Sequence, residues 1–473
     1  MSILEEQSSF VPGQDAWRVE QELNGVTVLL SEERVQPQKI ASWKSRAAKS
    51  LWLMIAVGLA VRLVVIAFLY RDHLNPVMDH WKFGWEMGRV ARSLYLGQGF
   101  SSPMYEPSGP TAWMAPVYPV VMAGVFKVFG LYSTASDIAL LVLNAVFAVL
   151  TTIPVHKMAQ RLLNSHFAVL AGWIWALLPY SIYVGAGRIW ENSLTTLIAA
   201  LIFCVMYRAE ATGSARDWAV WGALWGLGAL TSPALLAMLP FLLGWIALRE
   251  RRVGGNWLKK STLCVLVLFA MVTPWTLRNY IVFHRFIPMR DNFWLEVHVG
   301  NNGRTMEPCP DKSHPSNSAE ERDQFYRLGE IRYMNAKKVQ AQQFIAEHPR
   351  FFAQLTLRRI FFVWTGFWST DPNYLADEPL YWPGVFYSTM ITLMSVTGLW
   401  LAHRNGLGEW MVPVALAMFS FPLVYYITHP SYDYRHPLDP LMVIVAAYAC
   451  VELRNAIPGR EPQLQEMLES AGD

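Results

Sequence analysis

The sequence has few charged residues. Only 16% of its 473 residues are Asp, Glu, Lys or Arg, whereas an average soluble protein has about a quarter. In contrast, 53% of the residues are hydrophobic and 14% are aromatic, including 21 tryptophans. This balance is not that of a soluble protein of this size, and it is typical of a polytopic membrane protein.

Several chemical signatures are also missing. There is no phosphate-binding Gly-Lys-Ser/Thr loop, no His-Glu-x-x-His motif and no paired-cysteine metal site. An ATP-driven pump and a zinc protease are therefore not indicated. The four cysteines form no disulfide framework, because Cys204, Cys264 and Cys450 fall in apolar runs and Cys309 stands alone. The net charge of +3 says little about partners, and we expect no nucleic acid among them.

Long apolar runs are abundant instead. Residues 51–70 are long enough to cross a hydrocarbon core of about 30 Å. Similar runs lie at about 137–156, 166–184, 192–207, 218–233, 234–248, 261–277, 380–401, 410–428 and 437–453. The sequence therefore predicts an all-α polytopic protein with about ten spans. The chain lacks two similar halves, which weakens a transporter built from repeats.

Basic residues cluster between alternate runs, and this pattern predicts the topology. They are Lys39, Lys44, Arg46, Lys49, Lys157, Arg161, Arg208, Arg216, Arg249, Arg251, Arg252, Lys259, Lys260, Arg404, Arg454 and Arg460. By the positive-inside rule these residues and both termini lie in the cytoplasm. No cleavage site follows the first run, so we expect no cleaved signal peptide.

This topology divides the chain into five parts. We expect a cytoplasmic N-terminal extension at 1–48, a transmembrane core at 49–277 with a first outer loop at 71–136, a large outer loop at 278–379, transmembrane helices at 380–455 and a cytoplasmic tail at 456–473. In the outer loops, periodicity predicts helices that begin at Asp79 and end near Gly97, and that cover 115–130, 320–349 and 351–368.

Ionisable residues at the outer ends of spans are the candidates for a site. Asp79 is either a helix N-terminal acid, which the helix dipole favours, or a general base. Glu191 either pairs with Arg188 on one helical face or faces the same cavity as Asp79, because an acid this close to hydrocarbon is costly. Arg278, in "TPWTLRNYIVFHRF", is either an interfacial anchor or a phosphate contact.

The order of the motifs resembles a known family. "ARSLYLGQGF", "MAPVYPVVMAGVFKVFG", "GRIWENSL", "GLGALTSPALLAMLP", "PWTLRNYIVFHRF", "VGNNG" and "YDYRHPLDP" follow Asp79 in that sequence. Together they resemble the GT-C fold polytopic glycosyltransferases, and within them bacterial relatives of the dolichyl-phosphate-mannose–protein mannosyltransferases (glycosyltransferase family 39) and the lipid A aminoarabinose transferases. The resemblance covers about residues 50–455.

The resemblance implies a function in the cell envelope. It implies inverting transfer of a sugar from a polyprenyl-phosphate donor to a lipid, glycan or protein acceptor, on the extracytoplasmic face of a bacterial inner or plasma membrane. Asp79 matches the catalytic acid and Glu191 the assisting acid. Arg435 and His436 match the basic motif near the donor phosphate. This chain has His80 where a second acid is frequent, and Ser232 where an Arg is usual.

The chemistry suits these residue types. A base must take the acceptor proton, and cations must stabilise the leaving phosphate. We expect Asp79 to be the base and Arg435, His436, Arg278 and Lys82 to be the cations, with His80, Arg188 and Tyr434 in support. Some family members use a divalent metal, Mg or Mn, which Asp79, Glu191 and His80 would hold, although their spacing does not require one.

Two functions of other classes remain open at this stage. A flippase or transporter of lipid-linked sugars would need polar residues deep in several spans, whereas here they gather at the outer ends. A non-catalytic membrane scaffold would not need Asp79.

Overall fold

The computed structural model describes residues 40–69, 83–303, 305, 313–369, 381–431 and 433–456. The chain divides into two units, Met1–Ala47 and Ala48–Asp473, and the second contains the helical bundle. All regular structure in these ranges is helical, apart from one isolated bridge between Ser101 and Pro110. The expectation of an all-α protein is confirmed.

The spans follow the apolar runs of the sequence. Among the described residues, eight helices are long and apolar enough to cross a membrane, or nine when the bent pair α6 and α7 counts as one span. They are built from α1 (Ile40–Leu69), α4 (Thr134–Leu150), α5 (Thr152–Leu162), α6 (Ser165–Leu177), α7 (Pro179–Gly187), α8 (Asn192–Thr212), η3 (Pro233–Met238), α10 (Leu239–Arg252), α11 (Trp257–Phe283), α17 (Tyr381–Arg404), α18 (Gly408–Ser420), α19 (Leu423–Ile427), η5 (His436–Leu438) and α20 (Asp439–Asn455). With the 17-residue α9 (Ala215–Thr231), they account for the ten expected spans.

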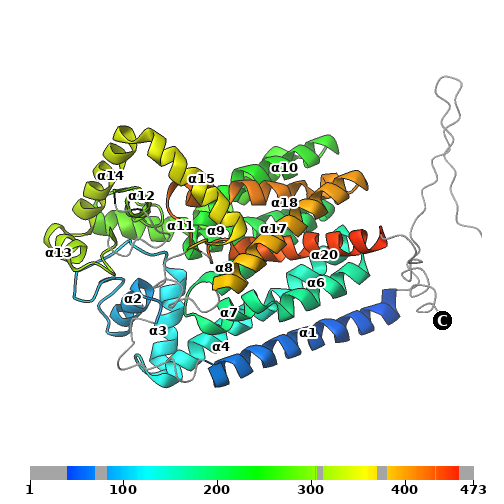
Figure 1. Ribbon diagram of the computed structural model, residues 1–473, viewed down its shortest axis with the longest axis horizontal. Helices are drawn as coiled ribbons and strands as arrows, with labels where there is room; N and C mark the ends of the chain where they lie inside the picture. The colour runs from blue at the N-terminus through cyan, green and yellow to red at the C-terminus, as the bar shows by residue number, and fades with distance from the viewer. Residues whose placement is uncertain are drawn as a thin grey trace, which may run out of the picture. The chain divides into compact units, whose positions relative to one another are not determined.

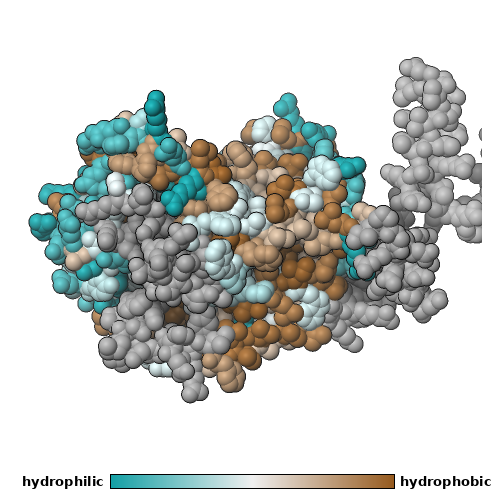
Figure 2. Space-filling view, in the orientation of Figure 1, coloured by the Kyte–Doolittle hydropathy of each residue, from teal (hydrophilic) through white to brown (hydrophobic). Residues whose placement is uncertain are grey.

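The outer surface of the bundle is apolar. Trp52, Phe68, Phe269, Phe386 and Trp400 are all more than half exposed. Figure 2 shows brown, hydrophobic side chains over the middle of the bundle and teal, hydrophilic ones on the part that carries α13 and α14. Large apolar side chains exposed over such an area indicate contact with lipid.

The interior of the bundle is packed around α9. Its tryptophans Trp218, Trp221 and Trp225 are completely buried and meet edge to face. Gly222 allows α9 to lie directly on α11, because a Cβ atom there would overlap the backbone carbonyl of Cys264. Small residues at such contacts are typical of helix packing in membranes.

Shorter helices gather at one end of the bundle, at the left of Figure 1. They are α2 (Glu86–Tyr95), α3 (Val117–Phe129), α12 (Phe293–Gly300), α13 (Ala319–Leu328) and α14 (Glu330–Glu347), and α15 (Pro349–Thr365) leads from them back to the spans. The expected helices over 115–130 and 351–368 correspond to α3 and α15.

Two of the expected loop helices differ from the structure. The helix expected to begin at Asp79 begins at Glu86, because residues 83–85 form a turn in which Trp85 has a φ of 53°. Its polar face does not point to water, since Glu86, Arg89 and Ser93 are all buried. The single helix expected over 320–349 is two helices, α13 and α14, which meet at Gly329 with a φ of 72°.

An arginine pins the bend between α6 and α7. Arg62, which is completely buried in α1, donates from Nη1 to the carbonyl oxygen of Ala176 at 2.7 Å and from Nη2 to the hydroxyl of Ser181 at 2.9 Å. The two helices differ in direction by 46° across Leu178, and Pro179 follows. The extended Leu178 ends α6, so the carbonyl of Ala176 belongs to the last turn of that helix, where carbonyls lack an intrahelical donor, and Arg62 donates to it.

Candidate active site

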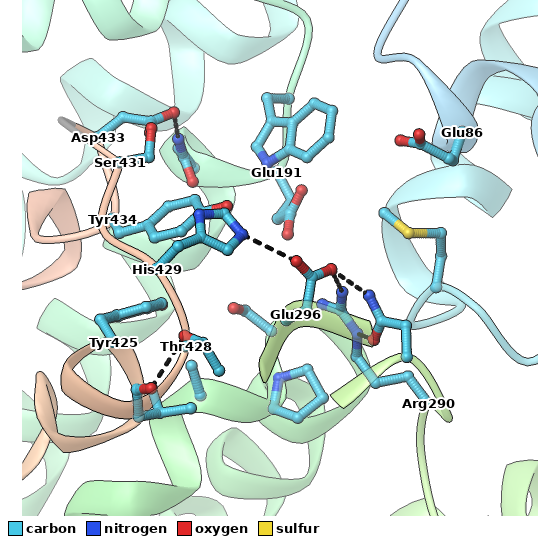
Figure 3. Close-up of a pocket in the computed structure, with 18 of the residues that line it drawn as sticks. Glu86, Glu191, Arg290, Glu296, Tyr425, Thr428, His429, Ser431, Asp433 and Tyr434 are labelled. Atoms are coloured by element: carbon cyan, nitrogen blue, oxygen red, sulfur yellow. Dashed lines mark hydrogen bonds and ion pairs between the residues drawn. The ribbon is translucent and has the colours of Figure 1, made fainter. Parts of the chain in front are cut away.

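A polar cavity of about 570 Å³ lies where the short helices meet the spans (Figure 3). Spans supply one wall through the start of α8, η3 and several residues between 424 and 437. The opposite wall comes from Trp85 and Glu86, residues 113–114, and several residues between 289 and 299 and between 314 and 317. Among the described residues, the lining includes four acids, Glu86, Glu191, Glu296 and Asp433, and two arginines, Arg188 and Arg290.

Glu191 lines this cavity. That it shares the cavity with Asp79 stays a prediction, because Asp79 lies outside the described residues. The chain breaks its helix at Arg188, which is extended, and Glu191 precedes the first residue of α8. Arg188 and Glu191 therefore do not share a helical face, and that expectation was wrong. Glu191 is 8% exposed, and none of the residues that the structure describes donates a hydrogen bond to its Oε2 atom. Burial raises the pKa of Glu191 to about 7, although the charge of Arg290 opposes the shift.

Glu296 faces Glu191 across the cavity in a very different environment. Its Oε2 atom lies 2.9 Å from Nε2 of His429, and its Oε1 atom accepts from Nδ2 of Asn292 at 2.6 Å. Arg290 Nη2 is 3.8 Å from the same Oε1 atom. Burial alone would raise the pKa of Glu296, but His429 and Arg290 outweigh it and lower the pKa to about 2. Glu296 is therefore a permanent negative charge.

Asp433 joins the two sides of the break before α8. It accepts from Asn192 Nδ2 and from the hydroxyl of Ser431, both at 2.6 Å, and Arg188 Nη1 lies 3.8 Å away. Tyr434 lines the same cavity, with its ring against Tyr425. The C-terminal motif therefore contributes Asp433 and Tyr434 to the cavity.

The basic residues of that motif lie elsewhere. Arg435 and His436 are buried and do not line the cavity. Arg435 Nε is 3.3 Å from Asp439, and its Nη1 atom donates to the carbonyl oxygens of Val363 and Ser388. His436 Nδ1 is 3.0 Å from Asp439. These contacts occupy Arg435 within the protein, so the expected contact with a donor phosphate has no geometric support.

Arg278 also lies outside the cavity lining. Its Nη1 and Nη2 atoms donate to the carbonyl oxygens of Thr111 and Phe100, at 2.7 and 2.8 Å. It therefore fastens α11 to the segment between α2 and α3. The expected residues Asp79, His80 and Lys82 lie outside the described residues.

The described residues contain no group of three or more His, Cys, Asp or Glu side chains placed to hold a metal ion. Since Asp79 and His80 lie outside the described part, the set of metal ligands expected from the sequence stays a prediction.

An apolar groove of about 510 Å³ lies beside the polar cavity. α6, α7, α17 and α20 form its walls, with Ile174, Phe386, Met390 and Val443 among the side chains that line it. Arg188 connects the two spaces, because it lines the cavity and its guanidinium lies 5.8 Å from the ring of Tyr183, which lines the groove.

Four cavity residues are new relative to the sequence expectations: Glu86, Arg290, Glu296 and His429. His429 could have been predicted from the sequence, because it directly follows the apolar run at 410–428 and lies four residues before Asp433. Glu296, in α12, and Arg290, shortly before it, carry no comparable signal in the sequence. Only their tertiary contacts identify them, through His429 for Glu296 and through Glu296 for Arg290.

The chain is similar to one protein family and to several solved structures. The family profile of the dolichyl-phosphate-mannose-protein mannosyltransferases matches residues 112–276. No curated protein sequence matches the chain. Among solved structures, the oligosaccharyltransferase AglB from Archaeoglobus fulgidus, in complex with an inhibitory peptide and a dolichol-phosphate, is 16% identical with a TM-score of 0.50. The match covers 89% of this chain and 53% of that one.

The apo form of the Archaeoglobus fulgidus oligosaccharyltransferase is 14% identical with a TM-score of 0.51, over 89% of this chain and 52% of that one. The chain has the GT-C fold. This chain spans about half the length of those two GT-C structures. A more distant likeness is to ArnT from Cupriavidus metallidurans bound to undecaprenyl phosphate, at 11% identity and a TM-score of 0.36, over 84% of this chain and 77% of that one.

Proposed function

We propose that the protein is a membrane glycosyltransferase, which transfers a sugar with inversion from a polyprenyl-phosphate donor to an extracytoplasmic lipid, glycan or protein acceptor. One observation carries the proposal. A carboxylate oxygen of Glu191 has no hydrogen-bond donor among the described residues, Glu191 lines a polar cavity, and an apolar groove meets this cavity at Arg188. The GT-C fold and the mannosyltransferase profile over residues 112–276 support it.

The two spaces suit the two halves of such a donor. An isoprenoid chain would lie in the apolar groove, and its sugar would project into the cavity. The phosphate would then lie near Arg188, at the junction, with Arg290 as a second cation. Arginine suits this role because its planar guanidinium binds phosphate oxygens in pairs. The dolichol-phosphate named in the complex of AglB is a ligand of this class.

The proposed reaction needs one base. A carboxylate takes the proton of the acceptor hydroxyl, whose oxygen forms a bond to C1 of the sugar from the side opposite the phosphate. The bond between C1 and the phosphate oxygen breaks, and polyprenyl phosphate leaves with the electron pair. Glu191 has a pKa of about 7, which suits a proton acceptor at neutral pH. The sequence assigns this role to Asp79, which lies outside the described residues and stays a candidate for the base.

The distribution of charge supports an extracytoplasmic site. Ion pairs between Arg161, Glu210, Arg249 and Glu409 join the ends of α5, α8, α10 and α18. These ends belong to the basic loops that the positive-inside rule assigns to the cytoplasm. The cavity, in contrast, lies at the start of α8.

A direct assay tests the proposal. The purified protein in nanodiscs is given a polyprenyl-phosphate sugar and an extract of cell-envelope lipids and glycans, and release of polyprenyl phosphate is measured. We expect release with the natural sequence and a loss of about 100-fold or more with Glu191→Gln or Asp79→Asn. The matched control is Glu320→Gln, an exposed acid on α13. Equal turnover in Glu191→Gln and in the control would show that Glu191 takes no part in the reaction.

A further inference from the structure

Two acids lie together beneath the wall of the cavity. Glu330, the first residue of α14, is 6% exposed, and both carboxylate oxygens of Asp291 are buried. The two residues meet at Ala112, whose N–H donates to Glu330 and whose carbonyl accepts from the backbone N–H of Asp291. Their side chains are close enough for the charge of Asp291 to raise the pKa of Glu330. Neither residue lines the cavity, and the reaction proposed above uses neither.

The surrounding protein, as far as the structure describes it, donates hydrogen bonds to Glu330 but not to Asp291, so Asp291 needs a proton from another source. Glu330 accepts from the backbone N–H of Ala112 at 2.6 Å and from the hydroxyl of Thr111. No N–H or O–H group of the described residues donates to either carboxylate oxygen of Asp291. Two buried carboxylates cannot both stay ionised in contact. A single proton between them would give Asp291 its missing hydrogen bond and remove the repulsion.

The pair holds two parts of the cavity together. Asp291 donates from its backbone N–H to the carbonyl oxygen of Ala112 at 3.1 Å, so Ala112 is bonded to both acids. Trp113, the next residue, is buried and lines the cavity, as do Arg290 and Asn292 on either side of Asp291. Arg290 and Asn292 in turn contact Glu296.

We propose that Asp291 and Glu330 are positioning residues, which share one proton and thereby hold Trp113 against the segment that carries Arg290 and Asn292. This inference rests on the proposed function for its effect on catalysis. The pair is not catalytic, because it does not reach the cavity. When the shared proton is lost, the two carboxylates repel each other and the wall of the cavity separates from α14.

The charges around the pair set the direction of its titration. Arg278 on α11 faces Glu330, and Arg290 is next to Asp291, while Thr111 and Ala112 face the pair as neutral groups. Burial raises the pKa of both carboxyls, and for Glu330 the charge of Asp291 raises it further, well above the ordinary value. An acid with a raised pKa stabilises the folded state while it is protonated, so the contact is present at low pH and lost as the pH rises.

Glu330→Gln tests the proposal, because an amide keeps an oxygen for Ala112 and offers a permanent N–H donor to Asp291. We expect the natural protein to lose transfer activity at alkaline pH by at least tenfold. Glu330→Gln should keep its activity at alkaline pH. At lower pH its activity should increase with pH as that of the natural protein does. The control Glu320→Gln should follow the natural profile. The same alkaline loss in Glu330→Gln and in the natural protein would overturn the proposal.

Hydrogen exchange gives a readout that needs no turnover. The N–H groups of Ala112 and Trp113 donate to Glu330 and to the Thr111 hydroxyl, so they report the contact directly. We expect protection factors over residues 111–115 to fall at least tenfold on raising the pH in the natural protein, and to stay constant in Glu330→Gln. Constant protection in the natural protein, or an equal fall in both, would overturn the inference even if transfer is absent and the proposed function fails.

Discussion

His429 and Glu296 form a contact of 2.9 Å between Nε2 and Oε2, and this contact joins α12 to the segment that follows α19. This contact also contributes to a difference in pKa between two acids of the cavity, Glu296 and Glu191. Glu296 has a pKa of about 2, whereas that of Glu191 is about 7. Carboxyls whose environments move their pKa values apart are typical of sites in which one acid exchanges protons and another stays charged.

The first prediction concerns the pH dependence of transfer. If Glu191 takes the acceptor proton, it must be ionised, so kcat/KM should rise tenfold per pH unit below about pH 7 and level off above it, before the alkaline loss expected from Asp291 and Glu330. The profile is measured from pH 5 to pH 8 with a fixed donor. In Glu191→Asp the residual rate should show a displaced midpoint. An unchanged midpoint would assign the titration to another group.

The second prediction concerns stability. A raised pKa means that the folded state holds the proton of Glu191 more tightly than the unfolded chain, so the stability falls as the pH rises from about 4 to about 7. Glu191→Gln removes this penalty. Thermal unfolding should show the variant to be more stable than the natural protein at pH 8, by about 2–4 kcal/mol, and similar at pH 5. A variant that is less stable at pH 8 would contradict the burial of an uncompensated charge.

The third prediction separates Arg188 from Arg435. Arg435 is held inside the protein by Asp439, and removal of one partner of a buried ion pair costs about 3–5 kcal/mol. Arg435→Gln should therefore lower the unfolding temperature without weakening the binding of polyprenyl phosphate by the folded fraction. Arg188→Gln should weaken that binding at least tenfold. Arg404→Gln, an exposed arginine at the end of α17, is the control for loss of charge.

The fourth prediction concerns the apolar groove. A Cβ atom at Gly384 would meet no atom within 4 Å, so Gly384→Leu fits the fold and fills part of the groove. Each methylene displaced from an apolar site costs about 0.8 kcal/mol. We expect the KM for a long-chain donor to rise about tenfold, with little change for a donor of two isoprene units. Gly244→Leu on α10, where a Cβ atom is equally unhindered, is the matched control, and an equal effect of both changes would exclude the groove.

Much of the fold could be predicted because the length of an apolar run is a local property of the sequence. The run at 261–277 lies wholly within α11 (Trp257–Phe283), and the run at 51–70 covers α1 from residue 51 to its end at Leu69. Periodicity was less informative in the loops. A polar pattern over 320–349 is compatible with one helix, but Gly329 adopts a conformation that residues with a side chain rarely adopt, and α13 ends there.

The site could be predicted only in part. Glu191 stands out because an acid at the end of an apolar run is costly, and that signal is local. Glu296 and His429 are separated by 133 residues, so no spacing rule connects them. Arg435 was expected near a donor phosphate, but the turn of η5 brings Asp439 beside it, and no local signal in the sequence distinguishes these two environments.

The bend held by Arg62 has a consequence for how the protein is made. Arg62 and its acceptor Ala176 are 114 residues apart, and at about 5–20 residues per second a ribosome needs about 6–23 s to synthesise that length. During this interval the Arg62 guanidinium has its acceptor Gly58 within α1, but it lacks its partners on α6 and α7. The insertion machinery must therefore retain α1, or lipid headgroups must solvate its charge, until α6 and α7 arrive. The helix α1 thus reaches its final environment only after a segment made more than a hundred residues later.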